Sequence, residues 1–169
     1  MLQPFDVLLA LKLAVSPQKH TQAELANQLD VSASQVNRGI KSCMKSGFID
    51  EFNRSVITPA LEEFLIHGVK YAFPGEMGSV ERGMPTAHSA LPLATKMGPS
   101  NVVYVWPDAA GRERGESVKP LYKTVPFAAS NDVKLYEALA LVDAIRIGRA
   151  REKNLATKAI STLLRNTND

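Results

Sequence analysis

Three basic side chains recur on one side of a predicted helix at residues 32–46. At about 100° per residue, Arg38, Lys41 and Lys45 fall within about 60° of one another, and residues 32–46 include no acidic residue. The solvated face of an ordinary helix mixes both signs of charge to form i,i+4 pairs. Basic groups without acidic neighbours are suited to phosphate, and arginine can also bind a guanine edge through two hydrogen bonds.

Short polar side chains extend this basic face. Ser34 falls in the same arc, while Gln35, Asn37 and Ser42 flank it. Amides can read adenine, and serine hydroxyls can bind phosphate. The candidate DNA-contacting residues on this helix are therefore Ser34, Gln35, Asn37, Arg38, Lys41 and Lys45. The alternative interpretation is an amphipathic helix whose polar face is only solvated.

The opposite side of the same helix is apolar and must rest on a neighbour. It carries Val36, Ile40 and Cys43. We expect these three to face a short helix at residues 21–29, whose apolar side carries Leu25, Ala26 and Leu29. Each helix starts with a capping-box pattern, Thr21 with Glu24 and Ser32 with Gln35. Two capped helices separated by a tight turn predict a helix-turn-helix.

Flanking segments complete the predicted module. Residues 4–15 are expected to form a first helix. Residues 48–51 and 56–58 are expected to pair as a small β-hairpin, the wing, with Arg54 near its tip as a further DNA contact. A helix should follow, with Thr58 as N-cap and Pro59 at its first position.

The segment TQAELANQLDVSASQVNRGIKSCMKSGFI resembles the helix-turn-helix of winged-helix transcription regulators of the MarR and IclR type. The matching positions are Thr21, Ala26, Val31, Ser32, Val36 and the pair Gly47-Phe48. The resemblance covers residues 5–58 and implies a dimeric bacterial or archaeal regulator. The wing is shorter than in that class. The rest of the chain matches neither the dimerisation helices of the MarR type nor the effector domain of the IclR type, so no ligand response is implied.

The remainder of the chain has weaker patterns. Residues 69–73 and 102–106 predict strands, residues 74–101 a long loop, and residues 117–122 a strand that returns after a turn at 108–115. Arg112 and Arg114 in that turn are possible additional DNA contacts, the alternative being an ordinary solvated hairpin tip. The overall expectation is an α+β fold: a winged helix-turn-helix with a small β-hairpin region, a long loop and C-terminal helices.

We expect three regions: a winged-helix DNA-binding domain at 1–68, a β-hairpin and long-loop region at 69–131, and a helical region at 132–169. In the last region, the apolar residues between Leu135 and Ile145 cover a wide arc of the predicted helix. Such an arc indicates either a central core helix or a subunit interface. Three arginines follow it, Arg146, Arg149 and Arg151, with three possible roles: a salt bridge to a partner chain, a helix cap or a contact to the DNA backbone.

Composition excludes several classes of function. The single cysteine, Cys43, allows no intramolecular disulfide, and the histidines at 20, 67 and 88 lack metal-ligand spacing. No nucleophile–base pattern or phosphate-binding loop is present, so no enzyme, metal or cofactor is expected. No apolar run reaches the length of a membrane span. With no signal peptide recognised, the cytoplasm is the expected location.

These patterns predict a sequence-specific transcriptional regulator that binds double-stranded DNA as a homodimer, reading the major groove with helix 32–46. The net charge of +3 permits such binding without arguing for it. The alternative is a winged-helix module for protein interaction or assembly within a larger complex, without specific DNA binding.

Overall fold

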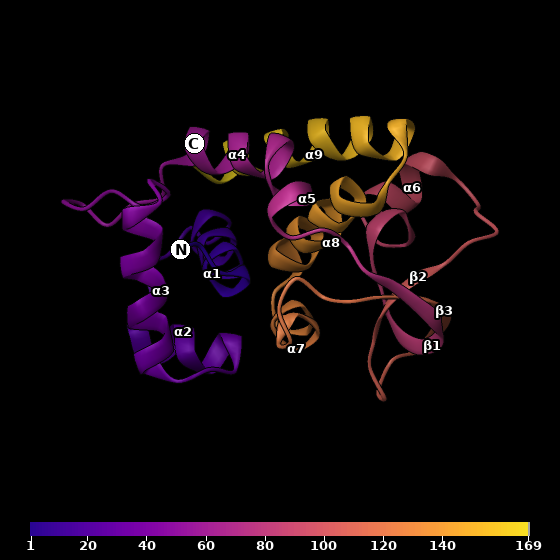
Figure 1. Cartoon of the computed structure of the whole chain (residues 1–169), viewed down its shortest axis with the longest axis horizontal. Coiled ribbons are helices and arrows are strands. Elements are labelled where there is room, and N and C mark those ends of the chain that lie inside the picture. The colour runs from indigo at the N-terminus through magenta and orange to yellow at the C-terminus, as the bar shows by residue number, and fades with distance from the viewer. Residues whose placement is uncertain (169) are drawn as a thin grey trace.

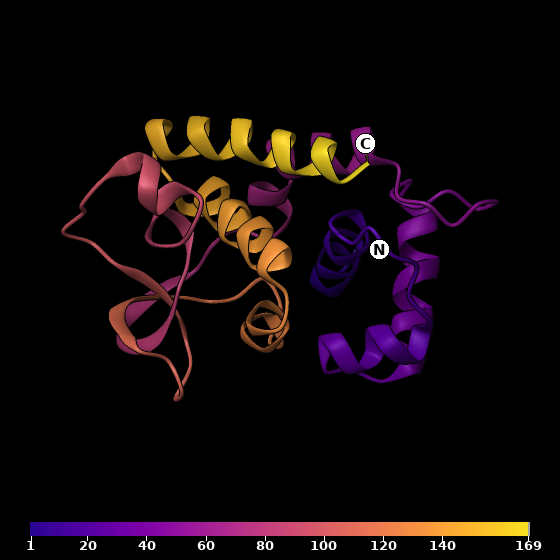
Figure 2. The same ribbon diagram turned by 180° about the vertical axis from the view of Figure 1, so that it is seen from behind.

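The computed structural model describes residues 1–168 and shows an α+β fold. Its helices are α1 (Pro4–Ala14), α2 (Gln22–Leu29), α3 (Ala33–Lys45), α4 (Thr58–His67), α5 (Val69–Ala72), α6 (Leu93–Met97), α7 (Val125–Ser130), α8 (Val133–Ile147) and α9 (Ala150–Asn168), with a 3-10 turn η1 (Ala87–Ser89). The strands are β1 (Met77–Pro85), β2 (Tyr104–Pro107) and β3 (Glu113–Val118). Helices α1–α3 lie at one end, the sheet at the other, and α8 and α9 lie between them (Figures 1 and 2).

Local capping accounts for α2 and α3. Thr21 Oγ1 accepts from Glu24 N at 3.1 Å, and Thr21 N donates to Glu24 Oε2 at 2.7 Å, which confirms the first capping box. Ser32 Oγ accepts from Gln35 N at 3.1 Å, but the Gln35 side chain bonds elsewhere, so the second box is only half formed. Asp30 adopts the left-handed region at φ 52° and makes the turn between the helices.

The predicted wing is reduced to a minimal hairpin. A single antiparallel bridge joins Ile49 to Val56, and Ile57 N donates to Phe48 O at 2.8 Å. Helix α4 follows at once, with Ile57 as N-cap and Thr58 already inside the helix. The predicted cap at Thr58 is therefore displaced by one residue.

Three predicted elements after residue 68 are wrong. The strand expected at 117–122 is instead β3 at Glu113–Val118, which begins inside the predicted turn and ends before the loop at 119–123. The segment expected as a strand at 69–73 is helix α5, which turns Val69 into the core while Tyr71 stays exposed. The loop expected at 74–101 contains β1, η1 and α6. Strand β1 was not predicted because its residues from Met77 to Arg82 are all exposed. A strand exposed on both faces has no alternation of apolar and polar residues in its sequence.

The sheet is not the hairpin that the turn at 108–115 predicts. Strand β1 pairs antiparallel with both β2 and β3, while β2 and β3 run parallel to each other. Gly83 lies opposite Pro107 on one side and Glu113 on the other. A Cβ at Gly83 would lie 2.0 Å from the carbonyl oxygen of Trp106, so only glycine permits this crossing.

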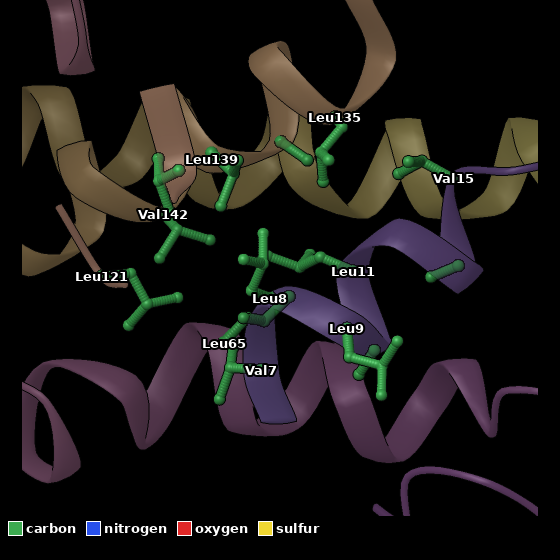
Figure 3. Packing of buried hydrophobic residues seen from close by; sticks show 14 of the residues in the cluster. Val7, Leu8, Leu9, Leu11, Val15, Leu65, Leu121, Leu135, Leu139 and Val142 are labelled. Atoms are coloured by element: carbon green, nitrogen blue, oxygen red, sulfur yellow. The ribbon is translucent and has the colours of Figure 1, made fainter. Parts of the chain in front are cut away.

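Helix α8 is the central helix of the core. Its apolar residues from Leu135 to Ile145 are buried among α1, α5, α7 and α9 within this chain. Figure 3 shows Leu135, Leu139 and Val142 of α8 meeting Leu8 and Leu11 of α1. The wide arc therefore belongs to a core helix and is not available as a subunit interface. One hydrophobic cluster includes residues from all three predicted regions.

Two ion pairs with buried cations tie α8 to its surroundings. Lys12 interrupts the otherwise apolar sequence of α1. Its Nζ lies 2.6 Å from Oδ2 of Asp132, the N-cap residue of α8. Arg146 Nη1 lies 2.7 Å from Asp143 Oδ1, and Arg146 also donates to Phe73 O. Arg146 is thus an internal structural residue, and none of the external roles expected for it is available.

Asp143 is the centre of a fully buried polar cluster. Its Oδ2 accepts from Trp106 Nε1 at 2.6 Å and from Thr86 Oγ1 at 2.8 Å. Burial raises the pKa of Asp143 above its ordinary value, and Arg146 opposes that rise. The cluster joins the end of β1, at Thr86, to β2 and α8. None of the helices within residues 1–168 has the length and apolarity needed to cross a bilayer.

Candidate nucleic-acid interface

Helix α3 rests on both α1 and α2 through its buried side. Val36 and Cys43 are fully buried as predicted, whereas Ile40 is only partly buried. Gly39 occupies the centre of this side, where a Cβ would lie 2.8 Å from Leu9 Cδ2 and 2.9 Å from Phe5 Cε1. The closest support of α3 is therefore α1, which packs across Gly39.

The opposite side of α3 is exposed and basic, as the angular analysis predicts. Ser34, Arg38, Lys41 and Lys45 are all exposed. Arg38 Nη1 donates to Ser34 Oγ at 3.0 Å, so the guanidinium lies along the helix surface. Helix α3 lies at the outer edge of the molecule (Figure 1). The structure thus brings four of the six predicted contact residues of this helix onto one accessible face.

Gln35 and Asn37 have partners inside the chain. Gln35 Nε2 donates to Tyr122 Oη at 2.7 Å, and Asn37 Nδ2 lies 3.4 Å from Gln22 Oε1. Both residues are partly buried. Gln35 must therefore exchange its bond to Tyr122 before it can read a base, whereas the weaker, exposed contact of Asn37 is easily released.

The flank of α3 next to α1 contains a buried carboxylate. Asp6 Oδ2 accepts from Ser42 Oγ at 2.6 Å and from Gln3 N at 2.7 Å. Cys43 Sγ donates to Asp6 O at 3.3 Å. Burial, with a smaller contribution from Asp6, raises the pKa of Cys43 to about 12, which keeps the thiol protonated and unreactive at neutral pH.

The hairpin after α3 carries the further predicted contact, Arg54. Asp50 Oδ1 accepts from Phe52 N at 2.9 Å and Asn53 N at 3.0 Å, which rigidifies the tip. Arg54 is exposed at φ 62°, and Phe52 is 95% exposed. The hairpin projects beyond the C-terminal end of α3 (Figure 1). Arg54 lines a hollow together with residues 16–20 of the α1–α2 connection, and not the hollow that Arg38, Lys41 and Lys45 line.

Arg112 and Arg114 lie far from this surface. Both are exposed, and Arg114 pairs across the sheet with Arg82. The sheet lies at the end of the molecule opposite α3 in both views (Figures 1 and 2). The structure does not bring these two arginines together with the other predicted contacts, and one protomer cannot apply both groups to the same short DNA segment.

Sequence analysis missed the loop at 119–123, which faces α3. Lys119, Leu121, Tyr122 and Lys123 line the same hollow as Arg38 of α3. The lysines flanking an aromatic residue were a possible signal, but the segment was interpreted as a return strand. Only the tertiary fold places these residues opposite a helix so distant in the sequence.

Within residues 1–168, no three His, Cys, Asp or Glu side chains gather closely enough to hold a metal ion. No known protein family, curated protein sequence or solved structure matches the chain. The functional interpretation therefore depends on the geometry of α3 and its neighbours.

Proposed function

We propose that this chain is a winged-helix, sequence-specific DNA-binding transcriptional regulator that reads the major groove with α3. The observation that carries the proposal is the exposed side of α3, where Ser34, Arg38, Lys41 and Lys45 share one face without an acidic neighbour on the helix. The same helix is held by a buried side against α1 and α2. A rigidly seated helix with a basic outer face suits a groove lined by phosphates.

The dimensions of α3 agree with this role. It has 13 residues, and the major groove of B-DNA, about 12 Å wide, admits an α-helix. Arg38 is placed to bind a guanine edge, while Lys41 and Lys45 follow toward the C-terminal end as phosphate contacts. Arg54 on the hairpin supplies a further contact to the adjacent backbone.

We further propose that the regulator acts as a homodimer on a pseudo-palindromic site. One helix reads only a few base pairs, whereas a genome offers millions of competing sites. Two heads spaced by about one helical turn, ~34 Å, combine the free energies of two half-sites. Since α1 and α8 are buried within the chain, the subunit interface must use other surfaces. This role implies a cytoplasmic location.

The test is selection of bound sites from random double-stranded DNA, followed by fluorescence anisotropy in a salt series. We expect specific binding whose affinity falls steeply between about 50 and 200 mM salt. Lys41→Gln should lower the salt slope by about one contact, while Lys158→Gln, an exposed change on α9, should not. Absence of any selected sequence and of salt-dependent binding would reject the proposal and favour the alternative, a protein-interaction or assembly module.

A further inference from the structure

A large hollow lies beside the proposed reading helix. It has a volume of about 840 Å³, is open to solvent, and is lined by α3, the first turn of α1 and the loop at 119–123. We call it the α1–α3 cleft. Small-molecule sites typically enclose about 300–1,000 Å³. The cleft therefore has room for a ligand of drug or nucleotide size.

The floor of the cleft is aromatic and held in place. Phe5 is buried and Tyr122 is half-buried, with ring centroids 5.2 Å apart. Tyr122 Oη is fixed by Gln35 Nε2 at 2.7 Å, and buried Leu121 lies beside it. The two rings are inclined at 59°, so they form an apolar corner against which an aromatic ring can pack edge-to-face.

The rim of the cleft is basic on both sides. Arg38, Lys41 and Lys45 line it from α3, and Lys119 and Lys123 line it from the facing loop. Lys119 also meets Glu76 at 3.3 Å, but that pair is largely exposed and weak. Charges of one sign around a concave surface concentrate ligands of the opposite sign.

Asp6 is the carboxylate among the lining residues, and it does not offset this field at the opening. It is 3% exposed, and its Oδ2 already accepts bonds from Gln3 N and Ser42 Oγ. The cleft therefore combines an apolar, aromatic lining with a cationic rim.

We propose that the α1–α3 cleft binds a small organic anion with a flat ring system, its ring against Phe5 and Tyr122 and its acidic group among the rim cations. A DNA backbone would match the rim but would have no use for the aromatic floor. Arg38, Lys41 and Lys45 also belong to the proposed DNA-reading face. A bound anion would neutralise those cations, and DNA and ligand would weaken each other's binding by the same factor.

The coupling to DNA rests on the proposed function, but occupancy of the cleft does not. The first experiment therefore uses the full chain without DNA and the fluorescent planar anion anilinonaphthalene sulfonate as probe. We expect saturable binding of one probe per chain. Lys119→Gln/Lys123→Gln should weaken it about tenfold or more, because two charge-assisted contacts are lost.

The matched control is Lys96→Gln/Lys134→Gln, which removes two exposed lysines outside the cleft. It should leave probe affinity unchanged, and thermal melts should show that both double variants are folded. Equal loss in the two double variants, or no saturable binding by the wild-type chain, would overturn the proposal.

The second experiment adds the selected DNA. We expect DNA to displace the probe, and we expect Lys119→Gln/Lys123→Gln to change DNA affinity less than twofold. If instead this variant loses DNA affinity and keeps probe affinity, the loop lysines contact the DNA backbone and the small-molecule site is rejected. If the chain binds no DNA yet binds the probe in the cleft as described, the proposed function fails while the cleft site stands.

Discussion

Gln35 Nε2 donates a hydrogen bond of 2.7 Å to Tyr122 Oη, across 87 positions of sequence. The bond joins the first turn of α3 to the loop at 119–123, and Tyr122 in turn packs on Phe5 of α1. A residue predicted to read bases thus has a structural task in the free protein. Binding of DNA through Gln35 requires this bond to be exchanged.

Removal of the Tyr122 hydroxyl tests the strength of this link. Tyr122→Phe keeps the ring on Phe5 but deletes the acceptor of Gln35, so the free energy of unfolding should fall by about 0.5–1.5 kcal/mol. Urea denaturation measures it. Tyr71→Phe, at a side chain that is 75% exposed, is the matched control and should change stability by less than about 0.5 kcal/mol. Equal stability of Tyr122→Phe and wild type would show that the bond contributes nothing in solution.

Arg38 should be the strongest single determinant of specificity on α3. Arg38→Ala should lower affinity for the selected site by about 1–3 kcal/mol, the worth of one bidentate base contact. The melting temperature should not change because the side chain is exposed. Anisotropy titration beside a thermal melt gives both values. Arg151→Ala, exposed on α9, controls for the loss of one positive charge, and similar losses for the two variants would contradict the assignment.

Replacing Gly39 by alanine should lower the stability of the protein, although alanine has the higher helix propensity. Alanine normally stabilises a helix by about 1 kcal/mol relative to glycine. Here the new Cβ would meet Leu9 and Phe5 at 2.8–2.9 Å, so Gly39→Ala should destabilise the protein by about 1–3 kcal/mol. Denaturant titration decides the sign. Ser34→Ala, on the exposed face of α3, should be neutral or stabilising. A stability gain in Gly39→Ala would show that α1 and α3 are less tightly packed than described.

The helices of this face were predictable because their signals are local. Thr21 with Glu24, and Ser32 before an amphipathic period, mark the starts of α2 and α3 without reference to the rest of the chain. The same periodicity placed Arg38, Lys41 and Lys45 on one side. The burial of Gly39 was not predictable, since a residue without a side chain leaves no hydrophobic signal.

Features that depend on distant pairing were not predictable. Strands β2 and β3 run parallel because each of them pairs antiparallel with β1. Strand β1 precedes both in the sequence, so the segment that joins β2 to β3 carries no signal of this arrangement. The local turn at 108–115 instead suggested a hairpin. The apolar arc of α8 indicated that other elements must pack around this helix, but it did not indicate which ones. In the structure, α1, α7 and α9 of the same chain pack against it. Lys119 and Lys123 became site residues only when the fold placed them opposite α3.

Cys43 should be inert to thiol reagents in the folded protein. With a pKa near 12 and a fully buried side chain, it should react with Ellman's reagent only after denaturation. The folded pKa lies above the ordinary value of 9.0, so the native state retains the proton more strongly than the unfolded state. The free energy of unfolding should therefore fall as pH rises from 9 towards 12.

Cys43→Ala isolates this contribution because it lacks the titrating thiol. The stability difference between wild type and the variant should be constant below pH 9 and shrink above it. Other groups titrate in the same range but are common to both proteins. Rapid labelling of native Cys43 at neutral pH would contradict its burial beneath α3.

Breaking the buried pair of Asp143 and Arg146 should be the most destabilising of these changes. The Arg146 side chain is 4% exposed, so Asp143→Ala would leave a cation in the core and two donors, Trp106 Nε1 and Thr86 Oγ1, without their acceptor. We expect a loss of about 3–5 kcal/mol. Trp106, the single tryptophan, reports unfolding directly by fluorescence. The double variant Asp143→Leu/Arg146→Met removes both charges, and it should recover part of that loss because no unpaired ion remains. A double variant less stable than Asp143→Ala would show that the ion pair itself, beyond the avoidance of an isolated charge, stabilises the junction of β1, β2 and α8.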